Sequence, residues 1–327
     1  MNAFNAVMRI VTTGLLMALA GYAAAQQAYP NKPIRFISPY PPGGGTTIVA
    51  RLIGQKLTES WGQQVIVDNR PGGNSIIGTE ALVKSPPDGY TILMTTGIHI
   101  IVGLLNPTPL PYDTIKDFAP VATLASYELM LVLHPSVPAN NLQDLIALAK
   151  SKPGQLNYAT AGSGSTGHLA TELLGILAGV KMQHIPYKGS GPALNDTIGG
   201  QVQLIVTSPP SAIQHIKNGL LKAIAISGET RLPALPQVPT FTEAGLPGFE
   251  VKGWYGVLAP AVTPKLIIDK LATEIAKILV MSDIKEKIVG LGMDPFISTP
   301  DQLAALMKAD MAKWVNVIKT ANIKVEN

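Results

Sequence analysis

The same local arrangement occurs twice in this chain: a short apolar strand, a glycine-rich turn and an amphipathic helix. In the first copy a strand at 34–39 leads through a turn at 40–47, with the helix expected from Ile48. In the second copy a strand at 156–160 leads through a turn at 161–166, with the helix expected from about Gly167. Such turns present free backbone N–H groups at the positive end of a helix dipole. Each turn is therefore a predicted anion site, and two facing turns would form a clamp.

Strands and helices alternate after each of these turns. Apolar residues at 48, 49, 52, 53 and 57 predict one helical stripe, followed by a strand at 65–67, a helix at 76–84 and a strand at 90–94. The order recurs with a helix striped at 169, 170, 173, 174 and 177, a strand at 182–185, a helix at 193–198 and a strand at 202–206. This alternation is typical of parallel sheets covered on both faces. We therefore expect an α/β fold with two lobes.

The rest of the chain indicates how the two lobes are connected. Helices are expected at 264–280 and from Thr299 to about Thr320, where Thr299 and Gln302 form a capping box. Apolar stretches at 121–133 and 251–258 flank the second run, and we expect both to cross between lobes. The first lobe would then comprise 26–128 and 252–327, with the second lobe, 129–251, inserted. Two crossings predict a hinge that permits closure around a ligand.

The first 25 residues have the features of a cleavable secretory signal. Arg9 is their only charged residue, the segment 10–20 is mostly apolar, and three alanines precede Gln26. The alternative, a retained membrane anchor, is disfavoured because the apolar segment is short for a membrane span. A lipoprotein would need a cysteine for acylation, and the chain has none. We therefore expect the mature protein to be free in the periplasm.

Composition narrows the possible classes of protein. The chain is 46% hydrophobic and 14% charged, which is typical of a globular protein. Its 25 basic and 21 acidic residues give a net charge of +4, and its lysines are scattered, so no nucleic-acid-binding stripe is predicted. No apolar run long enough to cross a bilayer follows residue 25, so the mature chain is not expected to be membrane-embedded. Without cysteine, disulfides and thiolate metal sites are excluded.

A series of ordered motifs then points to a family. The motifs are Pro42-Gly43-Gly44-Gly45, Asn69-Arg70-Pro71-Gly72-Gly73, Asp88-Gly89-Tyr90-Thr91, Pro111-Tyr112-Asp113, Asp117-Phe118-Ala119-Pro120, Gly162-Ser163-Gly164-Ser165 with His168, Pro186-Tyr187-Lys188-Gly189, Pro236-Gln237-Val238-Pro239-Thr240 and Glu243-Ala244-Gly245. Together they resemble the Bug family, also called TctC-like proteins, which are extracytoplasmic solute receptors of tripartite tricarboxylate transporters. The similarity covers essentially all of the mature chain.

The resemblance implies a fold and a function. The expected fold is a two-lobed periplasmic binding protein of type II, the Venus-flytrap architecture. The expected function is reversible binding of a small organic carboxylate, either a di- or tricarboxylate or an aromatic one, and its delivery to the membrane permease subunits of a tripartite transporter. The resemblance implies no catalytic residue, cofactor or metal, and a monomer suffices for delivery.

The resemblance also implies which residues hold the ligand. Backbone N–H groups and ordered waters would bind the carboxylate, with Gly43, Gly44, Gly45 and Thr46 on one side and Ala161, Gly162, Ser163 and Thr166 on the other. Further ligand-binding candidates are Tyr40, Thr47, Thr95, Thr96, His99, His168, Tyr187, Lys188, Thr207 and Ser208. Thr47 stands where many relatives carry an acidic residue. It would either exchange one helix cap for another or make the pocket more tolerant of a second carboxylate.

Other interpretations of single motifs remain. The segment 162–167 matches the dinucleotide motif GxGxxG, but no acidic residue follows near 20 positions later. The segment 163–167 partly resembles a nucleophile elbow, so a secreted serine hydrolase that acts on esters through Ser165 is the alternative function. His168 and Glu172 are four residues apart and could face the same side of a helix, but without a third ligand they make a weak metal site. A third functional class, a structural envelope protein, would have no saturable ligand. Packing is favoured over ligand contact for Trp254 and Tyr255, and ordinary side-chain roles for His134, His184 and His215.

Overall fold

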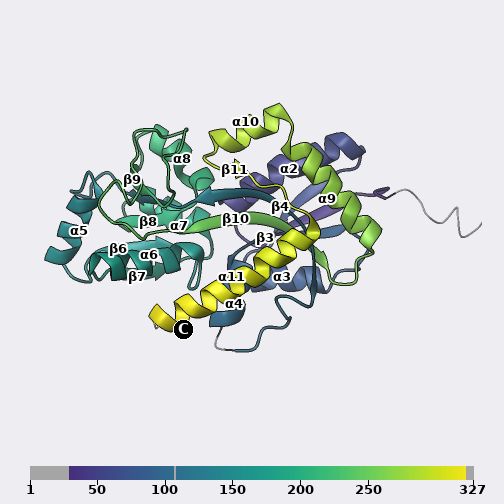
Figure 1. Ribbon diagram of the computed structural model, residues 1–327, viewed down its shortest axis with the longest axis horizontal. Coiled ribbons are helices and arrows are strands. Elements are labelled where there is room, and N and C mark those ends of the chain that lie inside the picture. Colours follow the sequence, from purple (N-terminus) through teal and green to yellow (C-terminus); the bar gives the residue numbers. More distant parts are fainter. Residues whose placement is uncertain (1–28, 107, 322–327) are drawn as a thin grey trace, which may run out of the picture.

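The protein consists of two α/β halves that lie side by side (Figure 1). The computed structural model describes residues 29–106 and 108–321, so the predicted signal at 1–25 lies outside the described residues. One half is built on a six-stranded sheet with the order β11-β4-β10-β3-β1-β2, and the other on a five-stranded sheet with the order β7-β6-β8-β5-β9. We call these halves lobe 1 and lobe 2.

Lobe 1 combines the N-terminal and C-terminal parts of the chain. Its elements are β1 (Ile34–Ser38), α2 (Gly45–Trp61), β2 (Val65–Asn69), α3 (Ile76–Val83), β3 (Thr91–Thr96), α4 (Ile98–Leu105), β4 (Phe118–Glu128), β10 (Lys252–Pro260), α9 (Lys265–Leu279), α10 (Ser282–Gly290), β11 (Asp294–Pro295) and α11 (Pro300–Ala321). The elements of lobe 2 are β5 (Met130–Leu133), α5 (Leu142–Ser151), β6 (Asn157–Thr160), α6 (Thr166–Ala178), β7 (Gln183–Pro186), α7 (Ser190–Ile198), β8 (Leu204–Thr207), α8 (Pro209–Lys217) and β9 (Lys222–Ile226).

Both sheets are mixed, which corrects the expectation of parallel sheets. β1 is parallel to β2 and β3, and β6 is parallel to β7 and β8. By contrast, β10 is antiparallel to β3 and β4, and β5 is antiparallel to β8 and β9. Parallel neighbours need a crossover connection, usually a helix. β4 passes directly into β5 in the other lobe without a helix, so the repeated β-α pattern does not extend to the strands that join the lobes.

Two neighbouring strands connect the lobes. β4 ends at Glu128 and β5 begins at Met130 in the other sheet. β10 begins at Lys252, opposite Glu128, and pairs with β4 along most of its length. The two strands run together from one half toward the other (Figure 1). The stretches 121–133 and 251–258 that were expected to cross between lobes therefore lie in this strand pair and in β5.

Alternating side chains hold helices on both faces of the lobe 1 sheet. In β1, Phe36 belongs to the cluster that includes α2 and α9, whereas Ile37 belongs to the cluster that includes α3, α4 and α11. Ile92 and Leu93 of β3 divide in the same way. Full burial of such a side chain stabilises the fold by about 1.5–3 kcal/mol. The sheet is thus the middle layer of the lobe.

Local sequence signals place the ends of most of the expected helices correctly, whereas α4, α5, α8 and α10 were not expected. Thr299 and Gln302 form the predicted capping box, with the Thr299 N–H donating to Gln302 Oε1 at 2.8 Å and the Gln302 N–H donating to Thr299 Oγ1 at 3.2 Å. Two helices start earlier than expected, α2 at Gly45 instead of Ile48 and α7 at Ser190 instead of Ala193.

Over residues 29–106 and 108–321, no helix has both the length and the apolar character needed to cross a membrane.

Candidate functional site

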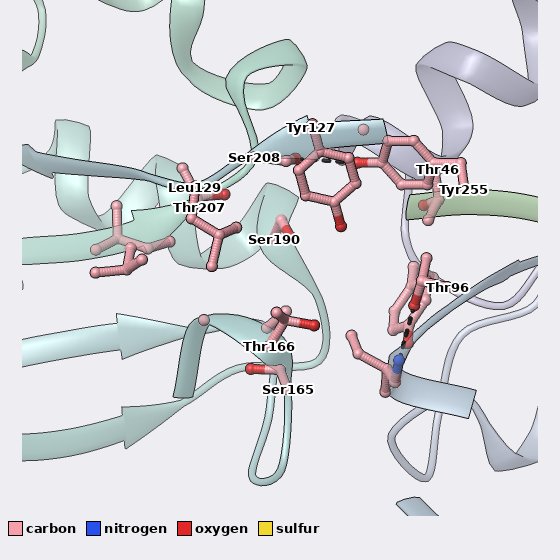
Figure 2. A pocket seen from close by; sticks show the side chains of 18 residues that line it. Thr46, Thr96, Tyr127, Leu129, Ser165, Thr166, Ser190, Thr207, Ser208 and Tyr255 are labelled. Atoms are coloured by element: carbon pink, nitrogen blue, oxygen red, sulfur yellow. Dashed lines mark hydrogen bonds between the residues drawn. The ribbon is translucent and has the colours of Figure 1, made fainter. Parts of the chain in front are cut away.

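A cavity lies between the two lobes, and helix N-termini from both lobes reach it (Figure 2). Gly44, Gly45 and Thr46 bring the start of α2 to the cavity, and Ser165, Thr166 and Gly167 bring the start of α6. α4, α7 and α8 contribute their first or capping residues, Ile98, Ser190 and Ser208. The empty space at this place, including the part that is open to solvent, is about 560 Å³.

The order of strands explains why these helices start at one place. β1, β3, β6, β7 and β8 each run directly into a turn and then into α2, α4, α6, α7 and α8. Parallel strands end at the same edge of a sheet, and ligands of open α/β sheets bind outside that edge. Each helix N-terminus carries roughly half a positive elementary charge. The facing edges of two such sheets therefore give the cavity a positive potential without a cationic side chain among its described lining residues.

Neutral hydroxyl groups, rather than charged groups, dominate the polar lining. Among the described residues, no Asp, Glu, Lys, Arg or His lines the cavity; the hydroxyl groups belong to Tyr40, Thr46, Thr96, Tyr127, Ser165, Thr166, Ser190, Thr207, Ser208 and Tyr255. Burial raises the pKa of Tyr255 to about 12 and that of Tyr127 well above its usual value. These phenols stay protonated at neutral pH and remain hydrogen-bond donors. A bound anion would thus meet hydroxyl groups and backbone N–H groups.

The first turn leaves one backbone donor free at the start of α2. Gly43 has a φ of 93°, a conformation that favours glycine, and Gly44 is the N-cap without a side-chain cap bond. The Gly45 N–H donates to Ser211 Oγ of lobe 2 at 3.0 Å. No hydrogen bond within the described part of the chain uses the Thr46 N–H. First-turn N–H groups have no partner inside their own helix, so this group is available to a ligand.

The second turn is held more tightly. Gly162 and Gly164 have φ values of 137° and 76°. The Ser165 hydroxyl caps α6 by accepting from the His168 N–H at 3.2 Å, and the Gly164 N–H donates to His168 Nδ1 at 3.0 Å. The N–H of Thr166 makes no hydrogen bond to any described residue. Each turn therefore offers a free first-turn N–H, on Thr46 and on Thr166, from opposite lobes.

Direct contacts join the lobes around the cavity. Asn74 of lobe 1 donates from Nδ2 to the carbonyl oxygen of Ser163 in lobe 2 at 2.6 Å. The Tyr255 hydroxyl of β10 donates to Ser208 Oγ of lobe 2 at 3.0 Å. The ring of Tyr255 stacks on that of Tyr127 at a centroid distance of 4.6 Å. Figure 2 shows these aromatic side chains beside Ser208 at one wall of the cavity. The lobes are thus in contact across the site.

Half of the residues expected at the ligand line the cavity, and the other half lie around it. The lining residues are Tyr40, Gly44, Gly45, Thr46, Thr96, Ala161, Thr166, Thr207 and Ser208. The residues outside the lining are Gly43, Thr47, Thr95, His99, Gly162, Ser163, His168, Tyr187 and Lys188. A role in ligand binding stays a prediction for all of them.

Several outlying residues have partners of their own. His99 is buried, with its Nε2 at 2.8 Å from the Thr114 carbonyl oxygen, and burial lowers the pKa of its imidazole to about 4. Thr95 and His99 line a separate small cavity next to Tyr40. The Tyr187 hydroxyl donates to Asp196 Oδ2 at 2.7 Å, while Lys188 is exposed. The contacts of His99 and Tyr187 indicate positioning roles rather than direct exposure to the cleft.

Thr47 does not cap a helix, which corrects one of its two interpretations. The N-cap of α2 is Gly44, and Thr47 lies inside the first turn. Its hydroxyl accepts from Asn69 Nδ2 at 2.7 Å and lies 3.3 Å from Ser38 Oγ. The side chain therefore ties α2 to the ends of β1 and β2. The interpretation that its neutrality favours a second carboxylate stays a prediction.

Nine of the lining residues were not among the ligand-binding candidates from the sequence. They are Ile98, Tyr127, Leu129, Ser165, Gly167, Ser190, Ile205, Val206 and Tyr255. Tyr127 and Tyr255 lie in the two stretches that were expected to cross between lobes. Segments that cross between lobes pass the centre of the cleft, and this was the signal that could have placed the two tyrosines at the cavity. Ser190 begins a helix whose start was expected at Ala193, so its place at a helix N-terminus was overlooked.

The alternative motifs have local structural roles here. The Ser165 hydroxyl serves as the cap of α6, and Glu172 Oε1 accepts a hydrogen bond from the Tyr158 hydroxyl. Within residues 29–106 and 108–321, no group of three metal-ligating side chains is placed to hold a metal ion.

Comparisons with known proteins agree with this geometry. Residues 49–323 match the family model described as tripartite tricarboxylate transporter family receptor, TctC. The protein BugT of Bordetella pertussis is 37% identical over 98% of this chain and all of its own length. An R. palustris protein solved with adipate is 36% identical with a TM-score of 0.88, covering 90% of this chain and 99% of its own.

A second solved relative is MatC from Rhodopseudomonas palustris with bound malate. It is 32% identical with a TM-score of 0.83, covering 89% of this chain and all of its own. The family match, the near-full-length identity and the shared fold lead to one conclusion. The chain belongs to the Bug, or TctC, family of tripartite tricarboxylate transporter receptors.

Proposed function

We propose that this protein is a periplasmic receptor that captures a small organic carboxylate between its lobes and delivers it to the permease of a tripartite tricarboxylate transporter. The observation that carries the proposal is the meeting of helix N-termini from both lobes in one cavity without charged side chains among its described lining residues. Such an arrangement favours an anion and requires the two lobes to act together.

The available donors are sufficient for useful affinity. A net hydrogen bond to a charged group contributes roughly 1.5–3 kcal/mol. Three or four such bonds would account for micromolar binding, about 8 kcal/mol, once ordering costs are subtracted. The N–H groups of Thr46 and Thr166 and the hydroxyls around them supply this number of donors. No arginine is needed.

The ligand we favour is a dicarboxylate with a short aliphatic chain. The cavity mixes hydroxyl groups with the apolar side chains of Ile98, Leu129, Ile205 and Val206. The solved relatives hold adipate and malate, which are both dicarboxylates. Neutral hydroxyls suit a second carboxylate because no fixed negative charge among the described lining residues repels it.

Closure would occur about the strands that join the lobes. We propose the boundaries 26–128 with 252–327 for the first lobe and 129–251 for the second, and removal of residues 1–25 on export. The bonds from Asn74 to Ser163 and from Tyr255 to Ser208 join the two lobes and would form as the cleft closes. Small-angle scattering should show a smaller radius of gyration with ligand at saturation, and an unchanged radius would contradict closure.

A ligand screen tests the proposal directly. Purified protein would be heated with mono-, di- and tricarboxylates, aromatic ones included, because a ligand that binds only the native state raises the melting temperature. Hits would be measured by calorimetry, and the ligand recovered unchanged. Incubation with esters tests the hydrolase alternative: turnover that is lost in Ser165→Ala, with no saturable carboxylate, would overturn the receptor proposal.

A further inference from the structure

Three aromatic rings stack behind the second turn, outside the cavity lining. The rings of His168 and His184 lie 4.0 Å apart at an interplanar angle of 13°. The ring of Tyr158 lies 5.0 Å from that of His184 at 20°. His168 is buried, with 5% of its surface exposed. These residues come from β6, β7 and the first turn of α6, so the stack joins the three elements that surround the turn.

The stack is bonded to both glycines of the turn. The Gly164 N–H donates to His168 Nδ1 at 3.0 Å. The Gly162 N–H donates to Thr160 Oγ1 at 3.2 Å, and this hydroxyl lies 2.7 Å from His184 Nε2. The Gly164 N–H is therefore engaged by an imidazole directly, and the Gly162 N–H is engaged by a hydroxyl that itself contacts an imidazole. The Thr166 N–H, at the start of α6, is left for the cavity.

This bonding fixes the protonation of His168. Because Nδ1 accepts the Gly164 N–H, the ring proton lies on Nε2. A second proton on Nδ1 would remove the acceptor and place a positive charge against a stacked imidazole. Burial and the neighbouring His168 lower the pKa of His184 to about 3. Glu172, one turn further along α6, has its carboxylate bonded to the Tyr158 hydroxyl. The His184 ring is therefore neutral at neutral pH.

We propose that His168 and His184 are positioning residues of the ligand site. By holding Gly164 directly and Gly162 through Thr160, they fix the second turn so that the first-turn N–H of α6 faces the cleft. The ligand then meets a donor that needs no rearrangement on binding. The inference rests on the proposed function. It assigns to this pair a role in ligand binding that acts through the turn and needs no contact with the ligand.

Variants at His168 separate positioning from simple packing. His168→Leu keeps the apolar volume but removes the acceptor, and we expect the dissociation constant for the best dicarboxylate of the screen to rise about tenfold or more. His168→Asn places an amide oxygen near the position of Nδ1 and should restore most of that affinity. Thr160→Val tests the second route without altering the rings, with Thr160→Ser as its matched control.

Spectroscopy supplies a readout that packing alone would not move. Nitrogen-detected NMR of the wild-type protein should show His168 protonated at Nε2 and not at Nδ1. The Gly164 amide should exchange slowly with solvent in the wild type and quickly in His168→Leu. These measurements need no ligand, so they remain decisive if no dicarboxylate binds, an outcome that would count against the proposed function alone.

Two results would overturn the positioning role. One is equal affinity of the wild type, His168→Leu and Thr160→Val for the same dicarboxylate. The other is a His168 ring protonated at Nδ1, or a Gly164 amide whose exchange does not depend on residue 168. If His168→Leu fails to fold, the comparison of Thr160→Val with Thr160→Ser decides the question.

Discussion

Replacing Gly45 by alanine adds one methyl group at the point where the two lobes and the start of α2 meet. An ideal Cβ at this position would lie 2.1 Å from the Tyr255 hydroxyl oxygen, 3.1 Å from Tyr255 Cζ and 2.9 Å from Ser208 Oγ. Gly45 is the first residue of α2 and is not among the glycines with positive φ, so alanine fits its backbone. The expected effect is therefore steric.

The cost follows from how firmly Tyr255 is held. Its side chain is 2% exposed, stacks on Tyr127 and donates to Ser208. It has to break at least one of these contacts to make room. Overpacking of this kind typically costs 1–3 kcal/mol. If the ligand-bound state carries this cost, the affinity for a dicarboxylate falls by roughly 5- to 150-fold.

Calorimetry on a set of four variants would test this reasoning. Tyr255→Phe removes the 2.1 Å clash with the hydroxyl oxygen and leaves the milder contacts, 2.9 Å with Ser208 Oγ and 3.1 Å with the ring carbon. We therefore expect the double variant Gly45→Ala/Tyr255→Phe to bind more tightly than Gly45→Ala alone. Gly290→Ala is the control, because no heavy atom of the described residues lies within 4 Å of its Cβ position. Wild-type affinity in Gly45→Ala, or no rescue by the phenylalanine, would refute the placement of this wall at the ligand.

Other perturbations test the remaining parts of the site. Gly44→Asp places a carboxylate at the start of α2 and should abolish calorimetric binding of dicarboxylates, so unchanged affinity would exclude the first turn as an anion site. In Asn74→Gly the glycine tolerates the φ of 50°, but the hydrogen bond to the Ser163 carbonyl oxygen is lost. This loss should remove roughly 1 kcal/mol of stabilisation from the closed state and weaken dicarboxylate binding about fivefold. An affinity equal to that of the wild type would show that this bond does not favour closure. Burial lowers the pKa of His99 from 6.5 to about 4, so this side chain binds a proton more readily in the unfolded protein than in the folded one. Its contribution to the free energy of unfolding is therefore complete above pH 6.5 and is lost as the pH falls toward 4. Urea titrations should then show the free energy of unfolding falling by up to about 3 kcal/mol over that range, with a shallower fall in His99→Leu, and identical pH dependence in the two proteins would count against this origin.

Much of the architecture was predictable because its signals are local. The strand, turn and helix of each anion site follow one another in the chain, and the capping box at Thr299 needs only residues three positions apart. The turns at 40–47 and 161–166 were therefore placed correctly next to helix starts, and residues from both turns line the cavity.

The remaining part of the site depends on long-range contacts. Tyr127 and Tyr255 reach the cavity because β4 and β10 pair antiparallel between the lobes, and a run of apolar residues does not encode that pairing. Side-chain direction was equally hidden. Thr47 turns toward Asn69, and His168 turns toward the back of its own turn, although the spacing of both residues places them at helix starts.

The direct test of the account is an NMR titration that follows the amide signals of Thr46 and Thr166 as a dicarboxylate is added. A carboxylate shared by both lobes should shift the two N–H resonances downfield together, with one common saturation curve. A ligand that binds with saturation but moves only one of these signals, or neither, would contradict capture by the paired turns.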